Sequence, residues 1–228
     1  MNTYKDLWME LNKYIEHTAL QPTMQSQDVD SLVKEALEYQ FMGVCVPAFW
    51  VKKAAREINA SDLSLVTVVG FPLGYQMTQT KEAEINQAIK DGANELDIVM
   101  NISALKSGMP WVKIELAKCA HLIHEAGCMM KVIIETAYLS EEEMVRATRL
   151  ACEAGTDFVK TSTGFAPQGA VAEHVALMRK TAPSSVGIKA SGGIKTLSKA
   201  KEMINAGADR LGCSSSIAIL EEWASQQT

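Results

Sequence analysis

Lys160 and Lys189 are the residues of this sequence best suited to covalent chemistry. Each ends a short apolar run, DFV before Lys160 and VGI before Lys189. An ammonium group at the end of a buried strand costs free energy, so a lysine placed there is a candidate functional residue. A neutral lysine attacks a carbonyl carbon and forms a Schiff base. The pair therefore predicts imine chemistry, unless the two lysines are unrelated and simply reach solvent from their strand ends.

The need for a neutral amine sets an energetic requirement on such a pair. Lowering the pKa of a lysine from about 10.4 to about 7.5 takes roughly 4 kcal/mol in favour of the neutral form. Two ammonium groups about 6 Å apart repel each other by roughly 2.8 kcal/mol at an effective dielectric of about 20, and burial can supply the rest. We expect one lysine to be the nucleophile while the other stays charged.

Asp97 is a carboxylate inside an otherwise apolar segment, residues 95–101 (ELDIVMN). If its side chain lies beside the two lysines, it can pair with an ammonium group and move protons. The alternative is a purely structural ion pair with one lysine. Cys45 also lies in an apolar run, but no base for it is identifiable, so we expect it to line a pocket rather than act as a nucleophile.

A phosphate site is indicated near the end of the chain. Gly192 and Gly193 follow the run that ends at Lys189, and Ser214 and Ser215 precede a helical pattern. Glycines let backbone N–H groups approach an anion, serine hydroxyls donate to it, and a helix N-terminus adds a favourable dipole. One such turn often only starts a helix. Two of them predict an anion site, to which segment 161–165 (TSTGF) can add donors.

Short apolar runs rich in Val and Ile recur eight times, and helix-period patterns separate them. This alternation is typical of parallel α/β proteins. An open doubly wound sheet uses the same alternation, but no glycine fingerprint follows the first run. We predict a single-domain (β/α)8 TIM barrel spanning residues 1–228. The runs are Tyr14–Thr18, Gly43–Pro47, Leu65–Gly70, Glu95–Met100, Met130–Glu135, Asp157–Thr161, Val186–Ala190 and Asp209–Ser214.

Polar residues at the ends of these runs are site candidates, because barrel enzymes carry their chemistry at the C-terminal ends of the strands. Both lysines and the aspartate satisfy this rule, which supports placing them in one site. The candidates are His17, Cys45, Asp97, Asn101, Glu135, Lys160 and Lys189.

Composition excludes several kinds of partner. The chain has 228 residues, a net charge of −5 with mixed signs, and no long apolar run, so we expect neither nucleic-acid nor membrane binding and a cytoplasmic location. Its five cysteines include no CxxC pair, which favours reduced thiols. His121 and His124 have a spacing that could bind a metal, but no third ligand is nearby, so we expect no metal site.

Five segments resemble the signature segments of the 2-deoxyribose-5-phosphate aldolase family and occur in the family's order. They are 68–74 (VVGFPLG), 95–108 (ELDIVMNISALKSG), 131–136 (KVIIET), 157–165 (DFVKTSTGF) and 186–194 (VGIKASGGI). The resemblance implies a class I aldolase on a TIM barrel, without metal or other cofactor. It would cleave 2-deoxy-D-ribose 5-phosphate into glyceraldehyde 3-phosphate and acetaldehyde, with the phosphorylated sugar as its partner and a homodimer as a possible assembly.

The resemblance also implies roles for individual residues. Lys160 would form the Schiff base, Lys189 would be its companion, and Asp97 would be the general acid and base. Thr161 would line the pocket with Cys45. The phosphate pocket would comprise Gly164, Gly192, Gly193, Ser214 and Ser215.

Some positions depart from the family pattern. Glu16 stands where an aspartate is usual, and Pro47-Ala48-Phe49 and Ala166 also differ from the usual residues. Such changes in strand-end loops affect substrate preference more than the Schiff-base step. They leave open a related Schiff-base aldolase that acts on another phosphorylated aldehyde or sugar. A non-catalytic phosphate-binding barrel is the second alternative.

Replacing either lysine tests these roles. We expect Lys160→Ala to abolish aldol cleavage with the fold retained, because the nucleophile is lost. Lys189→Leu should lower the rate strongly, because the charge beside the nucleophile is lost. Turnover of deoxyribose 5-phosphate and circular dichroism of the variants measure the two effects. Wild-type turnover by either folded variant would contradict the role assigned to that lysine.

Overall fold

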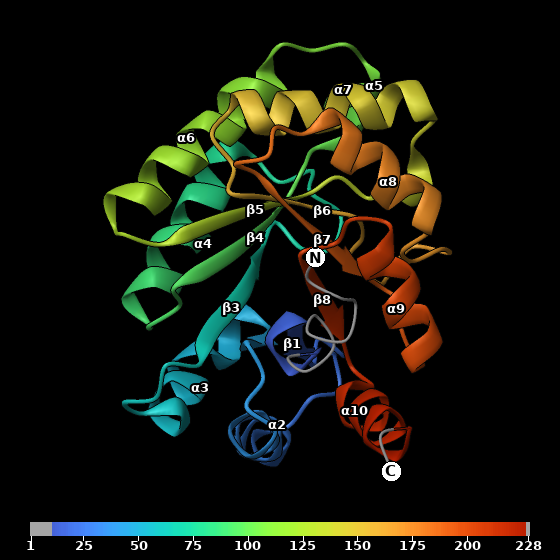
Figure 1. Cartoon of the computed structure of the whole chain (residues 1–228). Helices are drawn as coiled ribbons and strands as arrows, with labels where there is room; N and C mark the ends of the chain where they lie inside the picture. The colour runs from blue at the N-terminus through green and yellow to red at the C-terminus, as the bar shows by residue number, and fades with distance from the viewer. Residues whose placement is uncertain (1–10, 227–228) are drawn as a thin grey trace.

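The computed structural model describes residues 11–226 and forms a closed barrel of eight parallel strands surrounded by helices (Figure 1). Each strand pairs with the next in chain order, and β8 closes the barrel onto β1. The (β/α)8 prediction is confirmed, and each predicted run matches its strand to within two residues at either end. The strands are β1 (Ile15–Thr18), β2 (Gly43–Val46), β3 (Ser64–Val69), β4 (Glu95–Val99), β5 (Met129–Ile133), β6 (Phe158–Lys160), β7 (Gly187–Ser191) and β8 (Arg210–Cys213).

Helices pack around the outside of the barrel and return the chain to the start of each next strand. Gly92 and Gly207 follow the ends of α4 and α9 with φ of 109° and 105°, a conformation that favours glycine. The helices are α2 (Ser26–Glu38), α3 (Val51–Ile58), α4 (Thr78–Lys90), α5 (Ile102–Lys106), α6 (Trp111–Glu125), α7 (Glu141–Glu153), α8 (Ala172–Thr181), α9 (Leu197–Asn205) and α10 (Ser216–Ser225), with single turns η1 (Leu11–Tyr14), η2 (Ala48–Trp50) and η3 (Thr136–Tyr138).

Alternate residues of the strands enter two different environments. Leu96 and Ile98 of β4 belong to the apolar core that also contains the buried faces of the surrounding helices. The residues that alternate with them, Glu95 and Asp97, are also buried but ion-pair with side chains from other strands. Because side chains alternate along a strand, the second set points into the barrel. The barrel interior therefore holds charged groups, whereas the interior of most such barrels is packed with branched apolar residues.

The parallel register sets these interior charges side by side. Asp97 pairs in register with Lys131 of β5, and Lys160 of β6 pairs with Lys189 of β7. Lys189 is in turn opposite Arg210 of β8. Closure of the sheet brings these positions together from both sides of the barrel.

Two further features concern the residues outside the barrel interior. Within residues 11–226, no helix is long and apolar enough to cross a membrane. All five cysteines are unpaired, and Cys45, Cys119 and Cys213 are buried.

The start of α7 offers a test of how local sequence stabilises the shell of helices. The Ser140 hydroxyl accepts a hydrogen bond from the Glu143 backbone N–H at 3.2 Å, and the Glu143 carboxylate accepts one from the Ser140 N–H at 2.9 Å. We expect Ser140→Ala to lower the free energy of unfolding by about 1 kcal/mol, because the cap is lost. Urea denaturation measures this. Ser198→Ala, at an exposed position of α9, is the matched control and should change stability by less than about 0.5 kcal/mol.

Candidate active site

Lys160, Lys189 and Asp97 meet inside the barrel. Both lysine Nζ atoms donate hydrogen bonds to the same oxygen, Oδ2 of Asp97, at 2.7 Å each. The two nitrogens are therefore no further apart than twice that distance. Lys160 is 2% exposed, whereas Lys189 and Asp97 are fully buried. The pairing that the sequence suggested is present, and the aspartate is shared between the two lysines.

Four more charged residues inside the barrel contact these three residues or one another. Lys131 lies 3.1 Å from the other oxygen of Asp97, 2.5 Å from Glu95 and 3.5 Å from Glu16. Arg210 contacts both of these glutamates at 3.2 Å. Glu16 also accepts a hydrogen bond from Lys189, so the longer carboxylate at this position is fully satisfied.

Sequence reasoning did not identify Lys131, Glu95 or Arg210 as members of the site. A signal for two of them was present, since Glu95 and Asp97 alternate along β4 and Lys131 lies in β5, the next run. Two acids on one face of a buried strand require cations on a neighbouring strand. Arg210 gave no comparable signal, because it begins its strand, near the end of the barrel away from the predicted chemistry.

The charges in the cluster stabilise one another. Burial would raise the pKa of Asp97, but Lys131, Lys160 and Lys189 outweigh it and hold this pKa well below the usual range. Burial likewise opposes charge on Lys189, yet the carboxylates of Asp97 and Glu16 raise its pKa. Lys189 therefore remains an ammonium group, which is the state predicted for the companion lysine.

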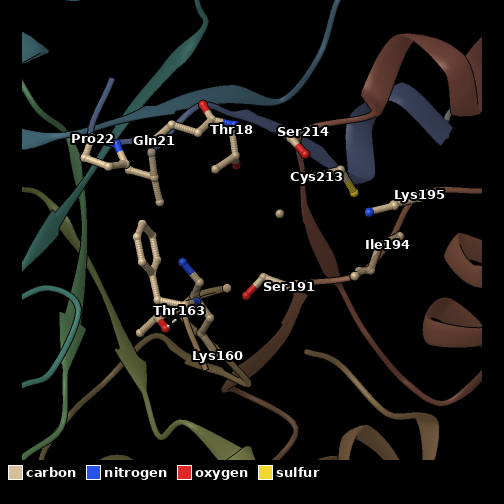
Figure 2. A pocket seen from close by; sticks show the side chains of 16 residues that line it. Thr18, Gln21, Pro22, Lys160, Thr163, Ser191, Ile194, Lys195, Cys213 and Ser214 are labelled. Carbon is tan, nitrogen blue, oxygen red and sulfur yellow. Dashed lines mark hydrogen bonds between the residues drawn. The ribbon is translucent and has the colours of Figure 1, made fainter. Parts of the chain in front are cut away.

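A cavity of about 390 Å³ opens above Lys160 at the C-terminal ends of the strands. In Figure 2 the amine of Lys160 points into this cavity from one side, and Lys195 approaches it from another. Lys195 was not predicted from the sequence, although it lies just two residues beyond Gly193. The lining residues are Thr18, Leu20, Gln21, Pro22, Lys160, Thr163, Gly164, Phe165, Ser191, Gly192, Gly193, Ile194, Lys195, Gly212, Cys213 and Ser214.

The predicted phosphate residues are mostly found in this lining. Gly164, Gly192, Gly193 and Ser214 belong to it, whereas Ser215 does not and instead precedes the first turn of α10. Cys45 and Thr161, predicted to line the pocket, are fully buried and absent from the lining.

Those two buried residues occupy supporting positions. The Thr161 hydroxyl donates to the Ser191 carbonyl at 3.2 Å and accepts from the Ser191 N–H at 3.1 Å, so it joins the loops after β6 and β7. Burial raises the pKa of the Cys45 thiol to about 11, although Lys189 and Lys160 act in the opposite direction. Such a thiol is a poor nucleophile at neutral pH, as the sequence indicated.

The backbone of the loop after β7 is shaped by glycine. Gly192 and Gly193 have φ of 86° and 75°, a conformation that other residues rarely adopt. Gly169 packs against this loop so closely that a Cβ there would lie 2.2 Å from the Gly192 carbonyl oxygen. Successive backbone N–H groups in such a loop can form a concave donor surface for an anion. Gly192 and Gly193 line the cavity, so their N–H groups are candidate donors to an anion there.

The remaining strand-end candidates have structural partners. His17 contacts Glu35 at 2.8 Å and the Ser216 hydroxyl at 3.0 Å. The Asn101 side chain accepts from the Ala104 N–H at 3.0 Å and so caps α5. These interactions connect strand ends to neighbouring helices.

Glu135, another strand-end candidate, lies just beyond β5 in a left-handed conformation with φ of 47°. Its carboxylate accepts from the Thr163 N–H at 3.1 Å. Burial raises the pKa of Glu135, against the opposing effect of the bonds from Thr163 and of Lys160.

Metal ligands do not gather in the part of the chain that the structure describes, where no group of three His, Cys, Asp or Glu side chains is placed to hold an ion. His121 lies 3.4 Å from Glu125, and His124 lies 2.9 Å from Asp157. Each histidine therefore has a carboxylate partner on the outer side of the barrel.

Comparison with known families identifies the chain. A family model described as "DeoC/LacD family aldolase" matches residues 12–222. The chain belongs to this family. The match includes the cavity and all seven charged residues of the barrel interior, and it agrees with the resemblance that the sequence segments indicated.

Similar members of the DeoC/LacD family include proteins named deoxyribose-phosphate aldolase. That of Thermococcus kodakarensis is 50% identical over 216 residues, covering 93% of this chain and 96% of that protein. That of Brevibacillus brevis is 47% identical over 213 residues, with the same coverage. Among solved structures, "QR15, an Aldolase" aligns with a TM-score of 0.91 at 42% identity, over 96% of this chain and 98% of its own.

A second solved structure extends the comparison to an assembly. The deoxyribose phosphate aldolase from Aeropyrum pernix, described as a unique tetrameric structure, aligns with a TM-score of 0.90 at 31% identity, over 96% of this chain and 93% of its own. The fold and the aldolase family are therefore supported by both sequence and structure.

The buried acids of this barrel predict a loss of stability in acid. Burial would raise the pKa of Glu95, but Lys131 and Arg210 lower it from the usual 4.5 to about 2. A depressed pKa stabilises the fold above the unfolded value, and this contribution is lost as pH falls from about 4.5 towards 2. We expect about 3 kcal/mol from this group over that window.

Urea unfolding at a series of pH values below 5 measures this contribution. Glu95→Gln should flatten the pH dependence relative to the unsubstituted protein, whereas Glu38→Gln, at an exposed position of α2, should leave it unchanged. Equal slopes for all three proteins would contradict the assignment.

Proposed function

We propose that this protein is a deoxyribose-phosphate aldolase that reversibly cleaves 2-deoxy-D-ribose 5-phosphate to glyceraldehyde 3-phosphate and acetaldehyde. The observation that carries the proposal is the placement of Lys160 in the cavity lining while its amine shares Asp97 with a second, buried lysine. The names of the relatives support the same activity.

Lys160 is assigned as the Schiff-base lysine because substrate can reach it. Its amine faces the cavity, whereas Lys189 is fully buried and does not line the cavity. Lys189 is held charged by Asp97 and Glu16, and a charged amine cannot attack a carbonyl. The buried lysine thus serves as a fixed positive charge beside the nucleophile.

The chemistry follows from the iminium ion that Lys160 forms with C1 of the open-chain sugar. This cation accepts the electron pair of the C2–C3 bond when that bond breaks, which gives an enamine, while the C3 hydroxyl loses its proton and glyceraldehyde 3-phosphate leaves. Protonation of the enamine and hydrolysis then release acetaldehyde and restore Lys160.

Asp97 and Lys189 are assigned to the proton transfers of this sequence. Oδ2 of Asp97 accepts hydrogen bonds from both amines, so the carboxylate can take up a proton that leaves Lys160 or the substrate, and the protonated Lys189 can donate a proton through it and recover that proton in a later step. The low pKa of Asp97, set by the three lysines against the effect of burial, keeps the carboxylate ionised between transfers.

The phosphate group is assigned to the far end of the cavity. Gly164, Gly192, Gly193, Ser214 and Lys195 all line the cavity, which supports this assignment, and Lys195 adds a positive charge. Anchoring the phosphate there aligns the carbonyl end of the sugar with Lys160 and lowers the entropy cost of the reaction.

The loop departures from the family pattern do not argue for a different substrate. Phe49 is 82% exposed, and neither it nor Ala166 lines the cavity. The Glu16 carboxylate pairs with Lys131, Lys189 and Arg210, none of which lines the cavity. A related aldolase with another phosphorylated substrate remains the second candidate.

A homodimer and a cytoplasmic location are also proposed, as the sequence indicated.

Borohydride reduction in the presence of acetaldehyde tests the proposal. We expect a two-carbon adduct on Lys160, because reduction fixes the imine that acetaldehyde forms with the nucleophile. Peptide mass mapping locates the adduct, and Lys160→Met should lack it. An unmodified Lys160 in folded protein would contradict the proposal, and turnover assays with several phosphorylated aldehydes and sugars would then separate the second candidate.

A further inference from the structure

The ion-paired cluster extends through the barrel from one end to the other. Glu95 and Arg210 are the first residues of β4 and β8, so they lie towards the N-terminal ends of the strands. Glu95 lines a shallow cavity at that end, with Ser64 and Asn94. Lys160 is the last residue of β6 and faces the substrate cavity. Charges at the far end of the barrel are thus connected to the nucleophile through Lys131 and Asp97.

The cluster holds one more cation than anion. Its members, joined by ion pairs of 3.5 Å or less, are the carboxylates Glu16, Glu95 and Asp97 and the cations Lys131, Lys160, Lys189 and Arg210. A buried excess charge is unfavourable, so the cluster is most stable when one cation loses its proton. Arginine does not lose its proton in proteins, which leaves the three lysines.

The three lysines differ in how many carboxylates they contact. Lys131 contacts three, Lys189 contacts two, and Lys160 contacts only Asp97, through an oxygen that it shares with Lys189. Lys160 is therefore the lysine with the fewest carboxylate contacts in the cluster. Loss of its proton leaves three cations facing three carboxylates.

We propose that Lys131, together with Glu95 and Arg210, sets the pH at which Lys160 becomes nucleophilic, although none of the three lines the substrate cavity. Lys131 acts as a positioning residue. Its ammonium group lies 3.1 Å from Oδ1 of Asp97, an ion pair without a hydrogen bond, while Oδ2 accepts hydrogen bonds from the two amines. With Arg210 it also neutralises Glu95, which would otherwise favour the charged form of Lys160. This inference rests on the proposed function, since it concerns the nucleophile of that reaction.

Other titratable groups around Lys160 and Lys131 complete the electrostatic setting. Burial raises the pKa of the Cys45 thiol to about 11 and that of Cys213 to about 12, so both stay neutral near pH 7. Glu135 accepts a hydrogen bond from the Thr163 N–H and is close enough to Lys160 for the ammonium group to act on its pKa, so it is a carboxylate outside the cluster that favours the charged form of Lys160. The groups facing the two lysines are Glu16 from β1, Cys45 from β2, Glu95 and Asp97 from β4, Glu135 after β5, Lys189 from β7, and Arg210 and Cys213 from β8.

Substitutions of Lys131 and of Glu95 should shift the pH dependence of kcat/KM in opposite directions. Lys131→Met removes a cation and leaves carboxylates unpaired, so the acid limb of kcat/KM should move to higher pH. Glu95→Gln removes an anion, so the same limb should move to lower pH. A unit charge about 6 Å away shifts a pKa by about two units at an effective dielectric of about 20, so each limb should move by roughly one to two pH units. The double variant restores the original balance and should bring the limb back towards the unsubstituted protein.

The experiment measures kcat/KM for deoxyribose 5-phosphate against pH, and borohydride trapping of acetaldehyde on Lys160, for all four proteins. Lys81→Met is the matched control, because Lys81 is a fully buried lysine paired with Glu115 at 2.6 Å between α4 and α6, outside the barrel. It should lower stability without moving the limb. Glu95→Gln keeps the size of the side chain and an acceptor for Lys131, so it remains available if Lys131→Met does not fold.

The outcomes separate this inference from the proposed function. Absence of an adduct on Lys160 in the unsubstituted protein would overturn the proposed function itself. An adduct with acid limbs that stay in place, or that move in the same direction for Glu95→Gln and Lys131→Met, would overturn the inference alone. If Lys131→Met is unfolded, a limb of Glu95→Gln within about 0.3 units of the unsubstituted protein would be enough to reject it. Opposite shifts, with return in the double variant, would support it.

Discussion

The carboxylate of Asp97 is the interaction on which the rest of this structure depends. A charge buried in a protein interior must be paired, and here one aspartate is paired with three lysines from three consecutive strands. Each lysine is also restricted by its contact with the carboxylate. This single group therefore fixes where the amines lie and how their charges balance. The arrangement is stable only because the carboxylates of Glu16 and Glu95 compensate the additional cations.

Such a cluster requires a closed barrel. Glu16 of β1 and Lys131 of β5 are separated by three intervening strands on either side, yet they lie 3.5 Å apart. A contact of this kind passes through the interior, so it cannot form on one face of an open sheet of the same strands. The alternation of side chains along each strand then separates this charged interior from the apolar layer beneath the helices. Closure of the barrel therefore determines both the fold and the positions of the charged groups inside it.

The two ends of the substrate cavity meet different physical needs. At one end a lysine must be neutral, which favours a dry environment and neighbouring positive charge. At the other end, where we propose that the phosphate binds, an anion is held best by backbone N–H groups in a glycine-rich loop and by an exposed lysine such as Lys195. Thr161 joins the two regions, because its hydrogen bonds with Ser191 connect the loop after Lys160 to the loop after Lys189. A displacement of one loop would therefore disturb the hydrogen bonds that connect it to the other.

The sequence by itself determined the eight strands, the barrel and the central residues Lys160, Lys189 and Asp97, because strand periodicity and the cost of a buried charge are local properties. It did not reveal that Ser215, Cys45 and Thr161 lie outside the cavity lining, or that Lys195 belongs to it. Those placements depend on how loops from different strands pack. It also did not reveal the partners of Lys131, Glu95 and Arg210. Only the tertiary structure decided these, because closure of the barrel brings together charges that lie far apart along the chain.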